Sequence, residues 1–504
     1  MSAEAAVDAP VVQTTKGSVR GLWRGECATF LGIPYAAPPV GALRFQEPVP
    51  HEAWDGVRDA TTQGATPLRG DSGGTIIPEP SVPGPSTLNV NVFTPAPAST
   101  GPSTSSGQAA ATSDAGLPVM FYIHGGAYSS GSIAGPWYDG RSFARDGVVT
   151  VVVSYRLGFD GFGWIEDAPS NRGVRDWIAA LEWVRDNIRA FGGDPDRVTI
   201  AGQSAGGSAA LVLLGIPAAA DLFHAAWSAS PAVAPITQED AEKLGRAAAA
   251  NGDVSPTVAG WSTLTEGQVR RAARDLIAPR QTLAGMRDSL TRGLAVGPHA
   301  DGDLIPDTTL RLLAAGGGSD KPLVIGANDD EFSDIVAPYR TWLQRVPSTV
   351  VLRMLGLPTA RRRAYLAANA GLGRAELIGR LVSDALIRRQ VVRAARARAH
   401  AGAGERTWIY RFAWVSPVKR SSFHCLEVPF FWDVLDADGV ERAAGGAPSR
   451  RLAAALHGAA VQFITTGEVD WAPAEDLGLA HTFDAPPPAE RESLGAYAGA
   501  RPLA

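Results

Sequence analysis

The sequence is poor in cysteine and lysine, and both shortages limit what the protein can be. Cys27 and Cys425 are the only cysteines among 504 residues and lie almost a full chain apart. Two such residues do not make a disulfide framework, so we expect two reduced thiols. Lysine is rare beside arginine, which is typical of a GC-rich bacterial genome. We therefore expect a bacterial protein that needs no disulfide to fold.

The sequence also has no long hydrophobic run and no strong basic charge. No segment offers about 18 consecutive apolar residues, and the N-terminus MSAEAAVDAPVVQTTKG has no basic start followed by an apolar stretch. We therefore predict a cytoplasmic protein without a membrane partner. A net charge of -5 lacks the basic footprint of a nucleic-acid-binding protein. The arginine-rich stretch 388–398 is interpreted as the solvated face of a helix.

One low-complexity segment, at 95–116, interrupts an otherwise globular sequence. Its composition, PAPASTGPSTSSGQAAATSDAG, cannot bury apolar surface, so we predict a flexible surface loop. Strand-like runs flank it at 88–93 and 118–123. We expect these two strands to be neighbours in one sheet, and we predict a single domain over residues 1–504.

The order of elements after this segment indicates the fold class. A buried strand at 148–154 is followed by an amphipathic helix at 174–191 and another strand at 197–201. Strand character returns at 322–326 and 407–414. Strands that alternate with helices predict an α/β fold in which a mostly parallel sheet is covered by helices.

A candidate nucleophile lies directly after the strand at 197–201. The sequence GQSAGG at 202–207 contains the pattern G-x-S-x-G between this strand and the small-residue run SAALVLL. Such a strand-to-helix turn holds a serine in a strained conformation with its hydroxyl exposed above the sheet, which predicts Ser204 as the nucleophile. The alternative is an ordinary glycine-rich turn, including one that holds a phosphate.

A second glycine-rich loop predicts the donors for an oxyanion. The strand at 118–123 runs into HGGAY at 124–128, and loops of this type supply backbone N–H groups to a developing negative charge. We predict Gly126, Ala127 and Ala205 as the oxyanion-hole donors. His124 precedes the serine, whereas the catalytic histidine follows the serine in α/β folds that carry the nucleophile on such a turn, so His124 is interpreted as structural.

Longer blocks around these motifs resemble one family. They are FLGIPYAAPPVGALRF at 30–45, HGGAY, VSYRLGFDGF at 153–162, and NRGVRDWIAALEWVRDNIRAFGGDPDRVTIAGQSAGG at 171–207. The chain is similar over nearly its whole length to the type B carboxylesterases. This resemblance implies an α/β-hydrolase fold and a Ser-His-Glu triad that works without a metal or an organic cofactor.

The resemblance also selects the two partners of the serine. The family's acid lies in a G-x-x-x-x-E context that matches Gly326 to Glu331, and its histidine precedes a Glu and a Pro, which matches His424. The residues alone leave other acids open, and other histidines fall outside the pattern. The rival acids are Asp329, Asp330 and Asp334, and the histidines outside the pattern include His299, His400, His457 and His481.

The chain departs from the family pattern at several places. Cys425 replaces the usual glycine after the histidine, which reduces backbone freedom, and we interpret it as a small buried residue. The family's acidic-acidic-cysteine segment is replaced by PST at 85–87, so Arg156 is expected to lack its usual acidic partner. Gln203 stands where many relatives have Glu, which makes a preference for cationic substrates less expected.

The expected function is that of a serine carboxylesterase. It hydrolyses a small-molecule ester to an acid and an alcohol through an acyl-enzyme, as a monomer or weak homo-oligomer. Helical regions at 236–320 and 339–400 are expected to surround the active-site gorge, and the GGA sequence at 125–127 resembles loops whose carriers accept esters of tertiary alcohols. Two alternatives are a catalytically idle interaction protein and a specialised hydrolase of amides, carbamates or lipid esters.

Overall fold

The structure is a computed structural model that describes most of the chain. The described residues are 9–67, 76–95, 97, 116–277, 283–474, 479–488, 492–493 and 495–504. The predicted loop at 95–116 therefore lies, except for residues 95, 97 and 116, outside the described residues.

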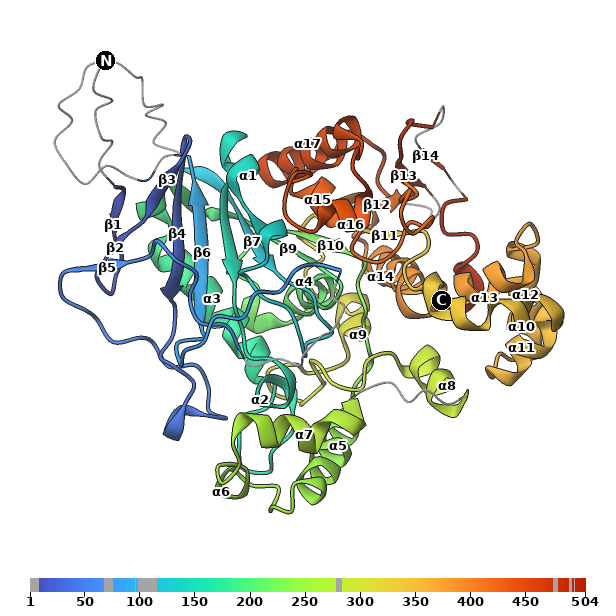
Figure 1. Ribbon diagram of the computed structural model, residues 1–504, viewed down its shortest axis with the longest axis horizontal. Coiled ribbons are helices and arrows are strands. Elements are labelled where there is room, and N and C mark those ends of the chain that lie inside the picture. The colour runs from blue at the N-terminus through green and yellow to red at the C-terminus, as the bar shows by residue number, and fades with distance from the viewer. Residues whose placement is uncertain are drawn as a thin grey trace.

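Eleven strands within the described residues form one twisted sheet (Figure 1). The order across the sheet is β14 (Glu492–Ser493), β13 (Ala480–Phe483), β12 (Thr407–Phe412), β11 (Leu323–Asn328), β10 (Ala225–Ala229), β9 (Gly193–Gln203), β7 (Leu117–Ile123), β8 (Val149–Val153), β6 (Asn89–Thr94), β4 (Cys27–Pro34) and β3 (Leu22–Arg24). The seven central strands in this order, from β13 across to β8, pair in parallel, whereas β14 at one edge and β6, β4 and β3 at the other pair antiparallel. A small second sheet contains β1 (Val11–Gln13), β2 (Ser18–Arg20) and β5 (Val57–Asp59). The predicted mostly parallel sheet is confirmed.

One prediction about this sheet is wrong. The strands on either side of the low-complexity segment, β6 and β7, belong to the same sheet but are not neighbours, because β8 pairs with both of them. The pattern of apolar residues predicts that a strand exists but does not determine its partner, since pairing depends on contacts across the whole sheet.

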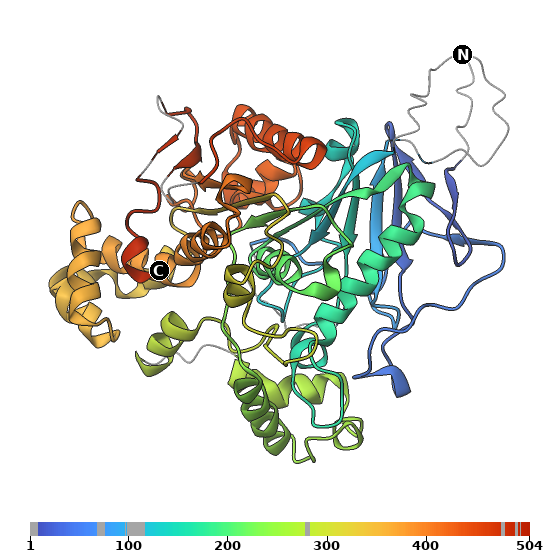
Figure 2. The ribbon, with the colours of Figure 1, turned by 180° about the vertical axis from the view of Figure 1, so that it is seen from behind.

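Both faces of the sheet are covered by helices, as the alternation of side chains requires. Along β7, Phe121 and Ile123 belong to one buried cluster, whereas Met120 and Tyr122 belong to another on the opposite face. Figure 2 shows α3 over the face turned to the viewer. The first face is covered by α3 (Arg172–Asn187), α4 (Ala205–Gly215), α9 (Thr309–Ala314) and α14 (Arg389–His400), and the second by α1 (Arg141–Arg145), α15 (Val428–Phe431), α16 (Val440–Ala444) and α17 (Arg450–Thr466).

Two helical excursions extend from the carboxyl ends of the central strands (Figure 1). The first follows β10 and, with α2 (Gly158–Phe162), lies below the sheet in the figure. It contains α5 (Gln238–Asn251), α6 (Val258–Trp261), α7 (Glu266–Ile277) and α8 (Leu283–Arg292). The second follows β11 and contains α10 (Arg340–Arg345), α11 (Ser348–Met354), α12 (Thr359–Ala368) and α13 (Arg374–Ser383). The predicted helical character of both regions is confirmed.

The second excursion begins and ends at one point. The Ser383 hydroxyl donates to the Asp330 carbonyl at 2.8 Å, accepts from the Phe332 N–H at 3.1 Å, and lies 3.0 Å from the Ser333 hydroxyl. The helices between these residues bury a separate apolar cluster that includes Leu352 and Leu381. The chain therefore leaves and returns beside the loop that carries Glu331.

The interpretation of 388–398 as a solvated helix face is wrong for its two ends. Arg388 and Arg398 are buried, at 2 % and 0 % exposure. Arg388 donates to Asp384 at 2.9 Å and to Asp329 at 2.7 Å, and Arg398 donates to Thr407 at 2.7 Å. Helical spacing predicts a helix but does not reveal that distant carboxylates and carbonyls satisfy buried guanidinium groups.

Candidate active site

Ser204 lies at a sharp turn between β9 and α4. Its backbone angles are φ 60° and ψ -120°, a region that non-glycine residues rarely adopt, and its N–H donates to the Ala229 carbonyl at 2.9 Å. A Cβ atom at Gly206 would lie 1.9 Å from the Ile123 carbonyl oxygen, so only glycine fits there. The G-x-S-x-G pattern thus serves both the strained serine and the close approach of α4 to β7.

The structure brings Ser204, His424 and Glu331 together in one hydrogen-bonded chain. His424 Nε2 lies 2.8 Å from Ser204 Oγ, and His424 Nδ1 lies 2.5 Å from Glu331 Oε2. All three residues are buried, at 8 % exposure or less. The His424 N–H also donates to the Glu331 carbonyl at 2.8 Å, so the backbone aligns the acid with the base.

The rival acids have other partners. Asp329 forms ion pairs with Arg388 and Arg411, and Asp330 forms one with Arg380 while accepting from the Ser422 N–H. Asp334 is exposed. Of the four carboxylates, only Glu331 contacts the imidazole of His424 within the described residues.

A second buried carboxylate lies behind Glu331, and sequence reasoning missed its role. The Ser230 hydroxyl lies 2.7 Å from Glu331 and 3.4 Å from Glu427, while Asn328 donates its N–H to Glu331 at 2.8 Å and its side-chain amide to Glu427 at 2.5 Å. Burial and the neighbouring Glu331 carboxylate raise the pKa of Glu427 to about 7. The Glu that follows His424 by three residues was part of the sequence pattern, but nothing local indicated that it contacts the acid.

The surroundings of His424 favour its charged form. Burial on its own would lower the pKa of His424, but the adjacent Cys425 thiol and the Glu331 carboxylate raise it well above its ordinary value. Cys425 itself is half-buried rather than buried, and its φ of 70° explains why a glycine suits this position. Its thiol lies 3.4 Å from the Gln203 side-chain oxygen.

The predicted oxyanion loop lies against the nucleophile. A Cβ atom at Gly125 would come within 3.1 Å of Ser204 Cβ, so the loop and the turn are in contact. Gly126 and Ala127 both have positive φ angles, 116° and 51°. Ala205 begins α4 directly after the serine, where its N–H is one of the unsatisfied donors of a helix N-terminus.

His124 lies outside the triad's hydrogen-bonded chain. It is fully buried, and its ring stacks on that of Tyr155 with 4.6 Å between the ring centroids, which fits its structural interpretation. Arg156, for which the segment at 85–87 offers no acidic partner, forms an ion pair with Asp176 of α3 at 2.6 Å. The other histidines, His299, His400, His457 and His481, take no part in the hydrogen-bonded chain at Ser204 within the described residues.

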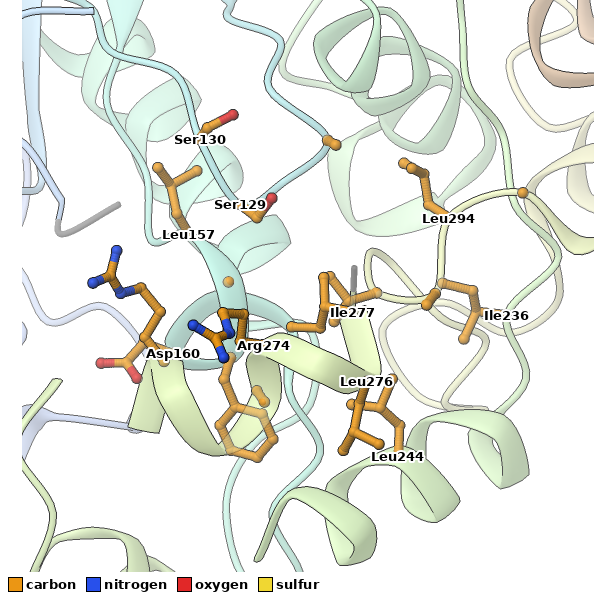
Figure 3. Close-up of a pocket in the computed structure, with 18 of the residues that line it drawn as sticks. Ser129, Ser130, Leu157, Asp160, Ile236, Leu244, Arg274, Leu276, Ile277 and Leu294 are labelled. Atoms are coloured by element: carbon orange, nitrogen blue, oxygen red, sulfur yellow. The ribbon is translucent and has the colours of Figure 1, made fainter. Parts of the chain in front are cut away.

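Ser204 opens into a cavity of about 1550 Å³. One wall carries Ala127 and Leu157, and the opposite wall is formed by α5, α7 and α8, which contribute Leu244 and Ile277. Figure 3 shows Leu157, Leu244 and Ile277 around the space, together with Asp160 and Arg274. The first predicted helical region thus borders the cavity along much of its length, whereas the second contributes Leu386 and Ile387 from the turn before α14.

Residues 8–477 match the sequence model of the carboxylesterase family. The chain belongs to this family. It is similar to the para-nitrobenzyl esterase of Bacillus subtilis (strain 168), with 34 % identity over 91 % of this chain and 90 % of the relative. It is also similar to the fumonisin B1 esterase of Sphingopyxis macrogoltabida, with 31 % identity over 91 % of this chain and 82 % of the relative.

Solved structures agree with this assignment. A para-nitrobenzyl esterase structure has a TM-score of 0.78 and 30 % identity, covering 95 % of this chain and 96 % of its own. A carboxylesterase of Geobacillus stearothermophilus has a TM-score of 0.77 and 30 % identity, covering 94 % and 96 %. The carboxylesterase described here therefore has the α/β-hydrolase fold and is a carboxylic ester hydrolase.

The described residues contain neither a cluster of metal ligands nor a membrane-spanning helix. No group of three or more His, Cys, Asp or Glu side chains there is arranged to hold a metal ion. No helix in the same part of the chain combines the length and the hydropathy that a bilayer crossing needs.

Proposed function

We propose that Ser204, His424 and Glu331 are the catalytic triad of this carboxylesterase. The observation that carries the proposal is the continuous hydrogen-bonded chain from the Ser204 hydroxyl through both nitrogens of His424 to Glu331. A hydroxyl is a weak nucleophile at neutral pH and needs a base within hydrogen-bond reach. A carboxylate at the far nitrogen orients that base and stabilises its protonated form.

The reaction then proceeds in two acyl transfers. His424 takes the Ser204 proton as the serine oxygen attacks the ester carbonyl, and the backbone N–H groups of Gly126, Ala127 and Ala205 stabilise the tetrahedral oxyanion. Collapse of this intermediate breaks the bond to the alkoxy oxygen, which leaves as an alcohol with the proton from His424. Water repeats the sequence on the acyl-serine and releases the acid.

Replacing the nucleophile tests the assignment. Ser204→Ala should abolish hydrolysis of a 4-nitrophenyl ester and labelling by an organophosphate, with a loss on the order of 10⁴- to 10⁶-fold in turnover. The melting temperature should stay close to that of the parent, because one small hydroxyl is removed. Ser262→Ala, at an exposed serine outside the cavity, is the matched control. Near-full activity in Ser204→Ala would show that another residue attacks the ester.

We further propose that the protein is of bacterial origin and cytoplasmic, that it is a monomer or weak homo-oligomer, and that the whole chain is a single domain. Size-exclusion chromatography with light scattering tests the oligomeric state directly.

A further inference from the structure

The cavity at Ser204 has a charge that differs from the charge of the whole protein. The chain carries a net charge of -5, yet basic side chains outnumber acidic ones along the cavity lining. Three of the basic residues, Arg44, Arg156 and Arg292, form ion pairs with neighbouring carboxylates. The other basic side chains of the lining are concentrated on two helices of one wall.

That wall is the packed pair α5 and α7. On its inner side α7 buries Val269 and Ala273 in a cluster shared with Ala248 of α5. Its other residues at the cavity include Arg270, Arg271 and Arg274, and α5 adds Lys243. All four basic side chains are exposed enough to meet a ligand.

Lys243, Arg271 and Arg274 are only weakly compensated, although Glu266 of α7 adds one acidic side chain to the same lining. Arg274 lies 3.0 Å from Asp275, but both side chains of this pair are at least 70 % exposed, and such surface pairs hold their partners weakly. Within the described residues, neither Lys243 nor Arg271 forms an ion pair. In Figure 3, Arg274 lies between Asp160 and Ile277, at the edge of the apolar lining.

We propose that this carboxylesterase prefers esters that carry a second, anionic oxygen group, and that Arg270, Arg271 and Arg274 of α7 bind this group. The inference rests on the proposed function of Ser204. The ester carbonyl lies at Ser204, an apolar spacer contacts side chains such as Leu244 and Ile277, and the anion reaches the guanidinium groups. Guanidinium forks suit carboxylate and other oxyanions, and a cleft lined by one sign of charge concentrates ligands of the opposite sign.

The test compares two substrates that differ in charge and in one methyl group, and it measures the release of 4-nitrophenol from each. Mono-4-nitrophenyl esters of straight-chain dicarboxylic acids present a free carboxylate at the far end, and their methyl-capped forms are neutral. The parent enzyme should show a higher kcat/KM for the charged ester at low ionic strength. This preference should shrink as salt is added, because about 0.1 M salt screens charges beyond roughly 10 Å.

The chain offers a matched control for the wall. R270Q/R271Q/R274Q should reduce the preference for the charged ester by about tenfold, as expected for several partly exposed ion pairs. Hydrolysis of the neutral ester should change little by comparison. R361Q/R362Q/R363Q removes the same charge from α12, which does not line the cavity, and should leave the preference unchanged.

Three outcomes would overturn the inference: a parent enzyme that favours the neutral ester at low salt, equal losses on both esters in the α7 variant, or the same loss in the α12 variant. None of these would affect the role of Ser204, because hydrolysis of the neutral ester and its loss in Ser204→Ala report on the triad separately. A chain that hydrolyses neither ester would overturn the proposed function together with the inference.

Discussion

The serine end and the acid-base end of the triad are built in different ways. Ser204 is held by a tight turn that contains Gly202 and Gly206, and its position depends on how closely backbones can approach. Glu331 and His424 lie 93 residues apart on two loops, and their alignment depends on hydrogen bonds and on the balance of buried charge. Added side-chain bulk should therefore disrupt the serine end, whereas a change of charge should disrupt the acid-base end.

Breaking the acid-base end should have the larger effect on turnover. Glu331→Gln preserves shape but removes the charge that orients and stabilises the imidazolium of His424, so kcat should fall by about 10⁴-fold. Steady-state kinetics with a 4-nitrophenyl ester measure the loss.

Asp334→Asn provides the control for Glu331→Gln, because this exposed carboxylate lies three residues further along the same loop. Its activity should match that of the parent. If Asp334→Asn lost as much activity as Glu331→Gln, the loop rather than the individual carboxylate would be responsible.

Crowding the serine end should reduce stability as well as activity. Gly206→Ala places a Cβ atom 1.9 Å from the Ile123 carbonyl, and the forced backbone shift should cost about 1 to 3 kcal/mol. Thermal unfolding should show a lower melting temperature. Gly458→Ala on α17 meets no atom within 4 Å and should raise stability by about 0.5 to 1 kcal/mol. A stable, fully active Gly206→Ala would show that the turn can accommodate a Cβ atom at this position.

A milder change at the serine end concerns the leaving alcohol. Because Ala127 lines the cavity beside Ser204 with only a methyl group, the parent enzyme should hydrolyse tert-butyl or linalyl acetate measurably. Ala127→Val should depress this activity about tenfold more than hydrolysis of a primary acetate.

The backbone at Ala127 complicates that variant, since its φ of 51° is unfavourable for a β-branched residue. Ala127→Gly, which tolerates this angle and adds space, should retain tertiary-ester activity. Equal losses on tertiary and primary esters in Ala127→Val, or no tertiary activity in the parent, would assign control of alcohol size to another wall.

The smallest expected effect is a shift in the pH dependence of kcat/KM, which tests the charge balance at the acid-base end. Because the pKa of His424 lies above its ordinary value, kcat/KM should rise with pH through a limb above about 6.5, where the imidazole loses its proton. Above its pKa of about 7 Glu427 is charged, and this charge favours the imidazolium. Glu427→Gln removes it, lowers the pKa of His424 and should move the limb to lower pH. A limb that stays in place or moves upward would contradict the coupling.

Local sequence was sufficient to predict the serine end of the triad but not the acid-base end, for a physical reason. Ser204 and its turn were predicted from adjacent residues, because a steric constraint acts between neighbours along the chain. Glu331 could be selected from its rivals only through the family resemblance, since local sequence does not show which carboxylate meets an arginine. The contacts of Glu427, the buried ends of 388–398 and the position of β8 between β6 and β7 depend on distant segments, and no local pattern indicated them.

The closure of the chain at Ser333 and Ser383 has a consequence for divergence within the fold. Because the excursion leaves and returns at the same hydrogen-bonded point, its outer helices α10 to α12 can be lengthened, shortened or exchanged without moving the loop that carries Glu331. Helix α13, in contrast, is tied to that loop by the ion pair between Arg380 and Asp330. Phe332 and Ile335, at its start, line the cavity. The outer helices can therefore diverge in sequence while the hydrogen bonds at the base of the excursion keep the triad acid in place.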